Sequence, residues 1–233
     1  MQVDIMTLFP EMLIKITQTS IMKRAIEKKI IKVNFHQIRD FALDKHKTVD
    51  DTTYGHGKGM LLKAEPIFLC FEDICKKIGK KPKLVYMSPR GTLLDQKKVK
   101  ELKNLENLAI LCGHYEGVDE RVIEKIVDEE ISIGDYVLTG GELPAMILVD
   151  AICRLLPGTL SAEECFTEES HYNGLLEYPQ YTKPEIWQGK AVPKVLLSGN
   201  HKEIKKWQYK QSILKTFENR PDLILKKLKN KEI

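Results

Sequence analysis

Two polar, glycine-bearing loops are the parts of this sequence best suited to do chemistry. The first is Gly113-His114-Tyr115-Glu116-Gly117, which follows the apolar run Leu108–Cys112, and the second spans 134–141, after a run that ends at Ile133. Glycine has no side chain, so backbone amides in such loops approach a ligand closely. In an open parallel sheet, ligand crevices form where the chain leaves the carboxyl ends of strands. The loops therefore predict a small-molecule pocket built largely from backbone.

A parallel α/β sheet is the arrangement that would position these loops. Val3–Phe9 and Ile31–Ile38 read as strands, and apolar residues recur at helical spacing over Glu11–Lys29 between them. This βαβ unit implies a right-handed crossover and a parallel sheet. A further strand at Lys83–Ser88, ending in a turn at 88–91, would give three neighbouring strand exits, at 86–91, 112–117 and 132–141. Helices are expected at 61–78, at 95–102 with an N-terminal cap at Leu94-Asp95, and at 142–156, and a charged, helix-like segment follows the first glycine loop.

The chain changes character after Pro157-Gly158. Residues 159–183 are polar, show no sustained periodicity and resemble a linker, with nothing in their sequence that would be buried. Beyond Pro184 the pattern is helical, and a small core is expected from Trp207, Ile213, Leu214 and Phe217. We therefore expect a sheet domain over 1–160, a flexible linker over 161–176 and a helical domain over 177–233.

Composition excludes several classes of protein. The chain is 42% hydrophobic and 30% charged, which is typical of a soluble globular protein. Its start carries no signal peptide pattern, and no stretch approaches the roughly 18 apolar residues of a membrane span. The five cysteines form no CxxC pair, which indicates reduced thiols in the cytoplasm and gives no ligand spacing for zinc.

Positive charge is concentrated at the end of the chain. Residues 201–233 hold ten Lys and Arg against four Asp and Glu, a balance of +6, whereas the remaining residues balance to −2. Such a region suits contact with a polyanion, most commonly nucleic acid. The alternative interpretation is a solvated, lysine-rich helix surface.

The long connection Arg39–Met60 is polar and carries Gly55, Gly57 and Gly59. Connections of this length inside a compact domain are usually functional or disordered. The GxGxG pattern lacks the GK[ST] ending of a P-loop, and no strand leads directly into it as a dinucleotide fingerprint requires. Nucleoside triphosphate binding is therefore not expected there.

Several segments together resemble the bacterial tRNA (guanine-N1)-methyltransferases of the SPOUT class. The resemblance runs through the chain in order, over Leu8–Met12, Arg39–Phe41 to Asp50-Asp51, Tyr54–Met60, Cys112–Arg121, Ser132–Ala145 and Leu197–His201. It implies an α/β fold whose parallel sheet domain ends in a deep trefoil knot, an exception to the rule against knots. It also implies an obligate homodimer that binds S-adenosylmethionine at the three strand exits and methylates N1 of guanosine 37 in tRNA, next to the anticodon.

The chemistry that the resemblance implies needs an acid–base residue and a cation. Guanine N1 carries a proton, so a base must remove it, and a positive group should stabilise charge on the neighbouring O6. The matching positions are Glu169 for the base and Arg154 for the cation. The family usually has aspartate at the first position, so Glu169 is a departure and Glu168 competes for the role. An exposed linker carboxylate and a salt-bridging arginine are the alternative interpretations.

The resemblance also implies which residues hold the methyl donor. They come from the three strand exits and the helix that follows: Tyr86, Met87, Ser88, Pro89, Gly113, Tyr115, Glu116, Gly117, Ser132, Ile133, Gly134, Tyr136, Val137, Leu138, Gly140, Gly141 and Pro144. Glu116 suits ribose hydroxyls or a Mg²⁺ ion. His114 is a second departure, because the family commonly has arginine there, and a charged contact would be lost or become pH-dependent.

Contact with tRNA is expected from two regions. His46, Asp50 and Gly59 resemble family positions near the tRNA or the subunit interface, and Lys202, Lys205, Lys206 and Lys210 would contact phosphates. The target guanine must be splayed out of the anticodon loop. Two alternatives remain at this point: a SPOUT methyltransferase of another RNA position, and an RNA-binding protein that has lost its cofactor.

Overall fold

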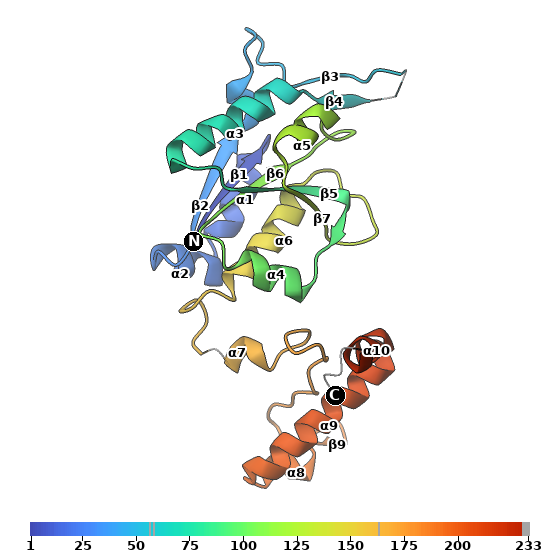
Figure 1. The fold of residues 1–233 in the computed structure, drawn as a ribbon. Helices are drawn as coiled ribbons and strands as arrows, with labels where there is room; N and C mark the ends of the chain where they lie inside the picture. Colours follow the sequence, from blue (N-terminus) through green and yellow to red (C-terminus); the bar gives the residue numbers. More distant parts are fainter. Residues whose placement is uncertain (56, 58, 163, 230–233) are drawn as a thin grey trace. The chain divides into compact units, whose positions relative to one another are not determined.

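The computed structural model describes residues 1–55, 57, 59–162 and 164–229. The chain divides into two compact units, Met1–Ser161 and Ala162–Ile233. The first contains the central sheet and the second is mainly helical (Figure 1). Within the described residues, no helix is both long and apolar enough to cross a membrane.

The first unit is built on a five-stranded sheet in the order β2-β1-β6-β5-β7, in which every pair of neighbours is parallel. Its strands are β1 (Gln2–Thr7), β2 (Lys32–Gln37), β5 (Lys83–Leu93), β6 (Asn107–Cys112) and β7 (Glu129–Ser132). Gln2 is in register with Lys32 on one side and Asn107 on the other. β1 and β6 are almost wholly buried, as expected for strands covered on both faces. The predicted parallel α/β sheet is confirmed.

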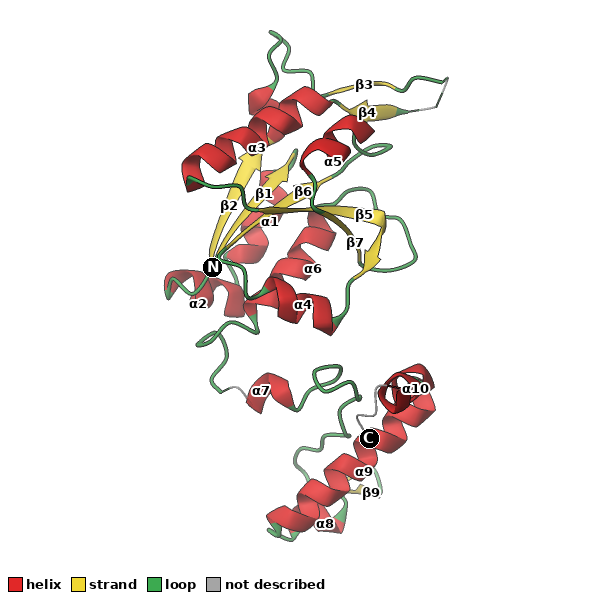
Figure 2. Cartoon of the chain, viewed as in Figure 1, coloured by secondary structure: helices red, strands yellow, loops and turns green. Residues whose placement is uncertain are grey.

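Helices cover both faces of this sheet (Figure 2). One layer contains α3 (Ala64–Ile78) and α5 (Glu120–Ile126), and the other contains α1 (Pro10–Thr17), α2 (Ser20–Glu27), α4 (Gln96–Leu102) and α6 (Glu142–Cys153). The predicted cap of α4 is confirmed, because the Asp95 side chain accepts a hydrogen bond of 2.9 Å from Lys98 N.

The helix expected over 11–29 is two helices. The break lies at Gln18 and Thr19, and Ser20 begins α2 with a φ of +50°. The hydroxyls of Thr17 and Thr19 donate to the carbonyls of Ile14 and Ile16 at 2.8 and 3.0 Å. Such local bonds compete with helical ones and favour a turn.

The turn predicted at Ser88–Gly91 lies inside β5. The pairing of β5 with β7 shifts register between Met87 and Thr92, so the strand passes through a bulge and continues. Pro89 is tolerated there because a bulge leaves a residue unpaired. A side chain on Gly91 would meet the Glu130 backbone, so the bulge also needs a glycine.

The connection 39–60 contains more structure than its sequence indicates. It begins with the 3-10 helix η1 (Ile38–Phe41) and ends in an antiparallel hairpin of β3 (Asp50–Thr52) and β4 (Met60–Leu62). The helix predicted from residue 61 therefore starts only at Ala64, because Leu61 and Leu62 pair with β3. His56 and Lys58 lie outside the described residues.

The second unit differs from expectation in its core. Its elements are α7 (Glu164–Thr167), β8 (Ile186–Trp187), β9 (Lys190–Ala191), α8 (Lys194–Leu197), α9 (His201–Asn219) and α10 (Pro221–Lys229). The helical pattern predicted beyond Pro184 is thus interrupted by the β8–β9 hairpin.

Two expectations about burial in this unit are wrong. Leu214 and Phe217 are 42% and 67% exposed, while Thr216 is fully buried and accepts a hydrogen bond of 2.8 Å from Leu176 N. The buried side chains of α9, Ser212 and Thr216, are small and polar, whereas the predicted core residues Trp207 and Ile213 are half-buried. Phe166, in the expected linker, is only 7% exposed.

Candidate active site

A cavity of about 490 Å³ opens at the carboxyl ends of β5, β6 and β7. Its wall contains every residue that the resemblance assigns to the methyl donor except Gly134, namely Tyr86, Met87, Ser88, Pro89, Gly113, Tyr115, Glu116, Gly117, Ser132, Ile133, Tyr136, Val137, Leu138, Gly140, Gly141 and Pro144. The fold thus gathers three stretches separated by up to about fifty residues of sequence into one wall, at the place where parallel sheets bind ligands.

Gly134 stands behind this wall. The Ser132 hydroxyl donates to its carbonyl at 3.0 Å, and Gly134 N lies 3.2 Å from the same hydroxyl oxygen. With a φ of +154°, Gly134 lies in the bend that follows β7. Its contribution is to the shape of the loop.

Sequence reasoning missed several other residues of the wall: Leu61, Arg90, Val118, Glu120, Ile123, Ile131 and Thr139. His114, which the resemblance marks as a departure from the family, also lines the cavity. The Arg90 guanidinium lies 3.1 Å from Glu120 and 3.5 Å from Glu130, and these ion pairs join three elements at the mouth of the cavity. No signal in the sequence connects these three residues, because they come together only across β5, α5 and β7.

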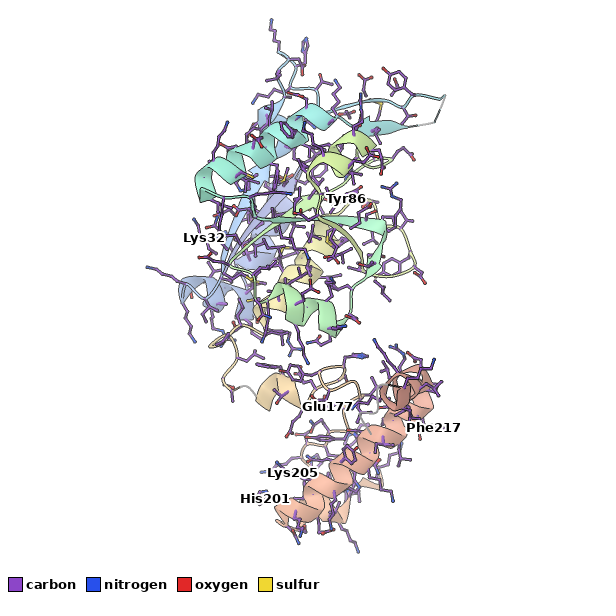
Figure 3. The ribbon with its side chains drawn as sticks, in the orientation of Figure 1. Lys32, Tyr86, Glu177, His201, Lys205 and Phe217 are labelled. Atoms are coloured by element: carbon purple, nitrogen blue, oxygen red, sulfur yellow. The ribbon has the colours of Figure 1, made fainter. Side chains whose placement is uncertain are left out.

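Tyr86 forms a buried part of the wall and is only 5% exposed (Figure 3). Burial, with a smaller contribution from the Glu130 charge, raises the pKa of its phenol to about 12, so it stays neutral at physiological pH. A Cβ on Gly113 would lie 2.7 Å from the Tyr86 hydroxyl oxygen. Glycine at 113 is therefore what lets the tyrosine ring and the first loop pack together.

The two glycine loops are joined by backbone contacts. Gly141 N donates to Gly113 O at 2.8 Å, and His114 forms an isolated bridge with Gly140. A Cβ on Gly141 would stand 2.8 Å from Cys112 Cα, closer than side chains are found. Close approach of the two backbones is thus the reason for glycine at 141.

A buried polar pair lies behind the second loop. Glu142 opens α6 and is 2% exposed, and its Oε1 accepts a hydrogen bond of 2.7 Å from the Thr7 hydroxyl, which is itself fully buried. Thr7 also accepts a bond of 2.9 Å from Phe9 N. The pair links the end of β1 to the loop that lines the cavity.

The N-terminal hairpin meets the first loop beside the cavity. A Cβ on Gly59 would lie 2.7 Å from Glu116 Cγ, and Glu116 N donates to Met60 O at 3.0 Å. Gly59 and Glu116, predicted for different roles, are therefore neighbours. The described residues contain no group of three or more His, Cys, Asp or Glu side chains able to hold a metal ion.

The two candidate catalytic residues belong to different units. Arg154 follows α6 at the end of the first unit, and Glu169 lies in the second unit. The side chains of both residues are partly exposed. Glu169 lines a cavity of about 240 Å³ whose other residues include Glu168, Tyr178 and Lys205.

The predicted RNA contacts are mostly accessible. His46 is exposed, and its backbone N–H donates to Asp44 at 3.0 Å, whereas Asp50 begins β3 and is half-buried. The lysines on α9 are all exposed, as Figure 3 shows for Lys205: Lys202, Lys205, Lys206 and Lys210. Their spacing of three and four residues places them on one side of the helix.

Residues 1–226 match the sequence profile of a family described as tRNA (Guanine-1)-methyltransferase TrmD. Three curated relatives carry the name tRNA (guanine-N(1)-)-methyltransferase. That of Ruminiclostridium cellulolyticum is 53% identical over 100% of both chains. That of Lachnospira eligens is 52% identical over 96% of this chain and 94% of its own, and that of Buchnera aphidicola is 49% identical over 100% and 93%.

Proposed function

The chain belongs to the tRNA (guanine-1)-methyltransferase family, and we propose that it transfers a methyl group from S-adenosylmethionine to N1 of guanosine 37 in tRNA. The observation that carries the proposal is the cavity at the carboxyl ends of β5, β6 and β7, with its paired glycine loops. Its mixed apolar and backbone-lined wall fits an adenosine group. We also propose that the first unit ends in the deep trefoil knot of the SPOUT class.

The donor supplies an activated methyl group when bound, so the protein's task is positioning and electrostatics. In the proposal, the apolar wall residues Ile133, Val137 and Leu138 flank adenine, and the backbone of the glycine loops reads its edge. Glu116 takes the ribose hydroxyls or a Mg²⁺ ion. Mg²⁺ usually keeps several of its waters in proteins, so a single carboxylate such as Glu116 suits it.

Acceptor chemistry is assigned to Glu169 and Arg154. Glu169 takes the proton from guanine N1, which makes that nitrogen nucleophilic, and Arg154 stabilises the negative charge that develops on O6. Glutamate places its carboxylate one methylene further from the backbone than aspartate does. Glu168, which is exposed and adjacent, is the competing base.

A homodimer is supported by an apolar face on two helices that contact each other. Met12 and Ile16 lie one turn apart on α1 and are 47% and 38% exposed, and Leu143 and Ile147 do the same on α6 at 50% and 47%. Exposed apolar residues at this spacing form stripes that a second copy would cover. Pro144, between the two exposed residues of α6, lines the cavity, so the interface would adjoin the donor site.

The tRNA partner is supported by charge. The lysine face of α9 suits phosphates of the anticodon stem-loop, which would make affinity fall as salt rises. His46, Asp50 and Gly59 are proposed to act near the anticodon or the subunit interface, and the target base is splayed out toward the donor. Because its substrate is tRNA, we propose that the enzyme acts in the cytoplasm.

The test is to incubate the full-length protein with radiolabelled S-adenosylmethionine and a tRNA transcript bearing guanosine at positions 36 and 37. We expect 1-methylguanosine at position 37, identified by nuclease digestion and mass spectrometry. A transcript with adenosine at position 37 is the control. Label at another position would favour a different RNA methyltransferase, and donor binding without transfer to a competent tRNA would contradict the proposal.

A further inference from the structure

Glu142 is a buried carboxylate for which the proposed reaction has so far found no use. It is 2% exposed, and its Oε1 is held by the Thr7 hydroxyl at 2.7 Å. Burying a carboxylate costs several kcal/mol unless something compensates it. The ion pairs among the described residues do not include Glu142. Two features compensate the burial of this side chain: the Thr7 hydrogen bond and its place in the first turn of α6, where the helix dipole favours an acidic residue.

Only a glycine separates this carboxylate from the donor cavity. Glu142 Oε2 is the nearest atom to the position that a Cβ on Gly140 would take, and Gly140 lines the cavity. His114 Nδ1 is 2.7 Å from the same position and is a buried nitrogen without a hydrogen-bond partner in the described structure. A side chain at 140 would thus fill the space between the carboxylate and the cavity wall.

The charged residues of the cavity wall also favour a positively charged ligand. Its carboxylates are Glu116 and Glu120, and its permanently charged cation is Arg90. Arg90 is already paired with Glu120 at 3.1 Å. This leaves Glu116 on the wall and Glu142 behind it, so the cavity is an environment that favours a positively charged ligand.

We propose that Glu142 is a specificity-determining residue that favours the cationic sulfonium of the methyl donor over the neutral thioether of its product. The inference rests on the proposed donor, S-adenosylmethionine. In the transfer, the guanine N1 electron pair forms the new N1–C bond as the S–C bond breaks. The electron pair of the S–C bond stays on sulfur, so the sulfonium charge disappears. Glu142 therefore attracts the substrate form and loses that attraction once the methyl group has left.

The strength of such an effect follows from burial. At an effective dielectric constant of about 20, two unit charges several ångströms apart interact strongly enough to change an equilibrium by roughly tenfold or more. Burial and, next, the nearby Glu142 raise the pKa of the Cys112 thiol well above its ordinary range.

Two nearly isosteric variants separate charge from hydrogen bonding. Glu142→Gln removes the charge while its amide oxygen still accepts from Thr7. Thr7→Val removes that hydrogen bond while the carboxylate stays. If Glu142 acted only as a hydrogen-bond acceptor that supports the fold, the valine variant would have the larger effect on ligand binding.

The experiment is calorimetric measurement of Kd for S-adenosylmethionine and S-adenosylhomocysteine with the full-length protein and both variants. In Glu142→Gln we expect Kd for the donor to rise roughly tenfold and Kd for the product to change less than about twofold. In Thr7→Val the ratio of the two constants should stay at its wild-type value. Equal changes for both ligands in Glu142→Gln would overturn the inference.

If Glu142→Gln does not fold, a second variant, Glu142→Asp, tests the same inference. Glu142→Asp withdraws the charge by one methylene, and its loss of affinity should be smaller and again confined to the donor. An equal loss for both ligands would overturn the inference. Failure of the proposed function looks different, because a wild-type protein that bound neither ligand would overturn the donor itself.

Discussion

At the scale of single residues, the cavity at the carboxyl ends of β5, β6 and β7 depends on glycines whose surroundings leave no room for a methyl group. Gly113 shows this most directly, since a Cβ there would lie 2.7 Å from the Tyr86 hydroxyl oxygen and 2.9 Å from Cε2. The tyrosine is 5% exposed and so has little space to move. Backbone approach, rather than a special φ angle, is the reason for glycine at this position.

Replacing Gly113 by alanine should therefore weaken donor binding. We expect Kd for S-adenosylmethionine to rise about tenfold or more, because an overpacked wall costs about 1–3 kcal/mol. Combining Gly113→Ala with Tyr86→Phe removes the nearest clashing atom and should restore part of the affinity. Calorimetry on the two single variants and the double variant checks this, and independent, additive effects would contradict the proposed clash.

The assignment of the base is also decided at a single residue. Glu169→Gln should lower the single-turnover rate of methyl transfer at least about 100-fold, because general-base catalysis typically contributes 10²–10⁴-fold. Donor affinity should stay within about twofold, since no donor contact is assigned to this residue. Glu168→Gln is the matched control, and an active Glu169→Gln beside an inactive Glu168→Gln would move the role to Glu168.

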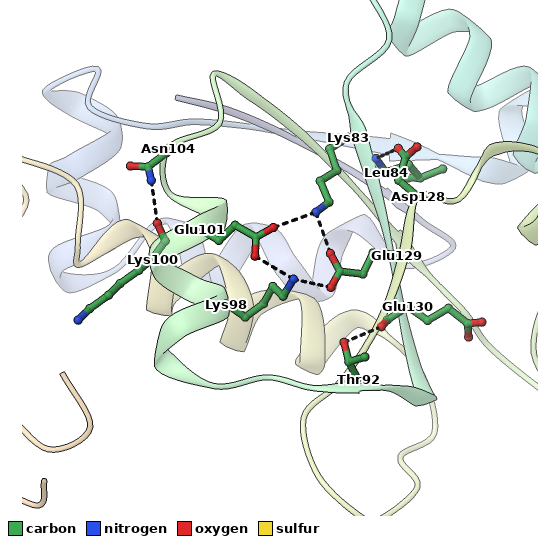
Figure 4. A network of polar contacts seen from close by, with 10 residues as sticks. All are labelled: Lys83, Leu84, Thr92, Lys98, Lys100, Glu101, Asn104, Asp128, Glu129 and Glu130. Atoms are coloured by element: carbon green, nitrogen blue, oxygen red, sulfur yellow. Dashed lines mark hydrogen bonds and ion pairs between the residues drawn. The ribbon is translucent and has the colours of Figure 1, made fainter. Parts of the chain in front are cut away.

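At the scale of elements, the edge strand β7 is held in place by a closed ring of charges (Figure 4). Lys83 Nζ lies 2.8 Å from Glu129 and 3.4 Å from Glu101, and Lys98 Nζ lies 2.7 and 3.0 Å from the same two carboxylates. The ring joins α4 to β5 and β7. Because β7 leads into the second glycine loop, the ring also supports a wall of the cavity.

The ring predicts a pH-dependent contribution to stability. Burial raises the pKa of Glu129, but hydrogen bonds from Lys83 and Lys98 outweigh burial and hold the net pKa below its ordinary value of about 4.5. A group whose pKa is lower when folded stabilises the protein above its unfolded pKa, and the contribution is lost as pH falls through the folded value. The loss should therefore occur below about pH 4.5.

Glu129→Gln should lower the free energy of unfolding by about 1–2 kcal/mol at neutral pH and by less in acid. Urea titrations followed by circular dichroism at about pH 7 and pH 4 measure this. Glu27→Gln is the matched control, since the Glu27–Lys23 pair is exposed at both ends and spans 3.8 Å. A variant whose deficit is the same at both pH values would show that charge in the ring is not its cause.

At the scale of the whole molecule, the proposed enzyme is a pair of chains. Ile147→Glu places a charge on the apolar face of α6 and should shift the dimer to monomer, seen by analytical ultracentrifugation. Methylation should fall with it if both subunits build each site. Leu228→Glu, at another exposed apolar position in the second unit, is the control. An unchanged sedimentation coefficient for Ile147→Glu would place the interface elsewhere.

Much of the first unit could be predicted from sequence because its signals are local. The apolar runs of β1 and β6, the cap of α4 and the glycines after β6 and β7 each depend on neighbours within a few residues. Family resemblance then indicated which strand exits share one cavity. Local patterns failed where pairing decides the structure, as in β4, the extension of β5 through its bulge and the β8–β9 hairpin.

By itself, then, the sequence determined the kind of sheet, the places where its loops carry glycine and the family to which the chain belongs. The tertiary structure alone decided which distant side chains meet. Thr7 and Glu142 are 135 positions apart, and Arg90 reaches Glu120 and Glu130 from another strand. No periodicity records such pairs, because side-chain contacts between elements depend on register and crossover geometry. The buried carboxylic side chain of Glu142 beside the cavity is therefore visible only in the folded chain.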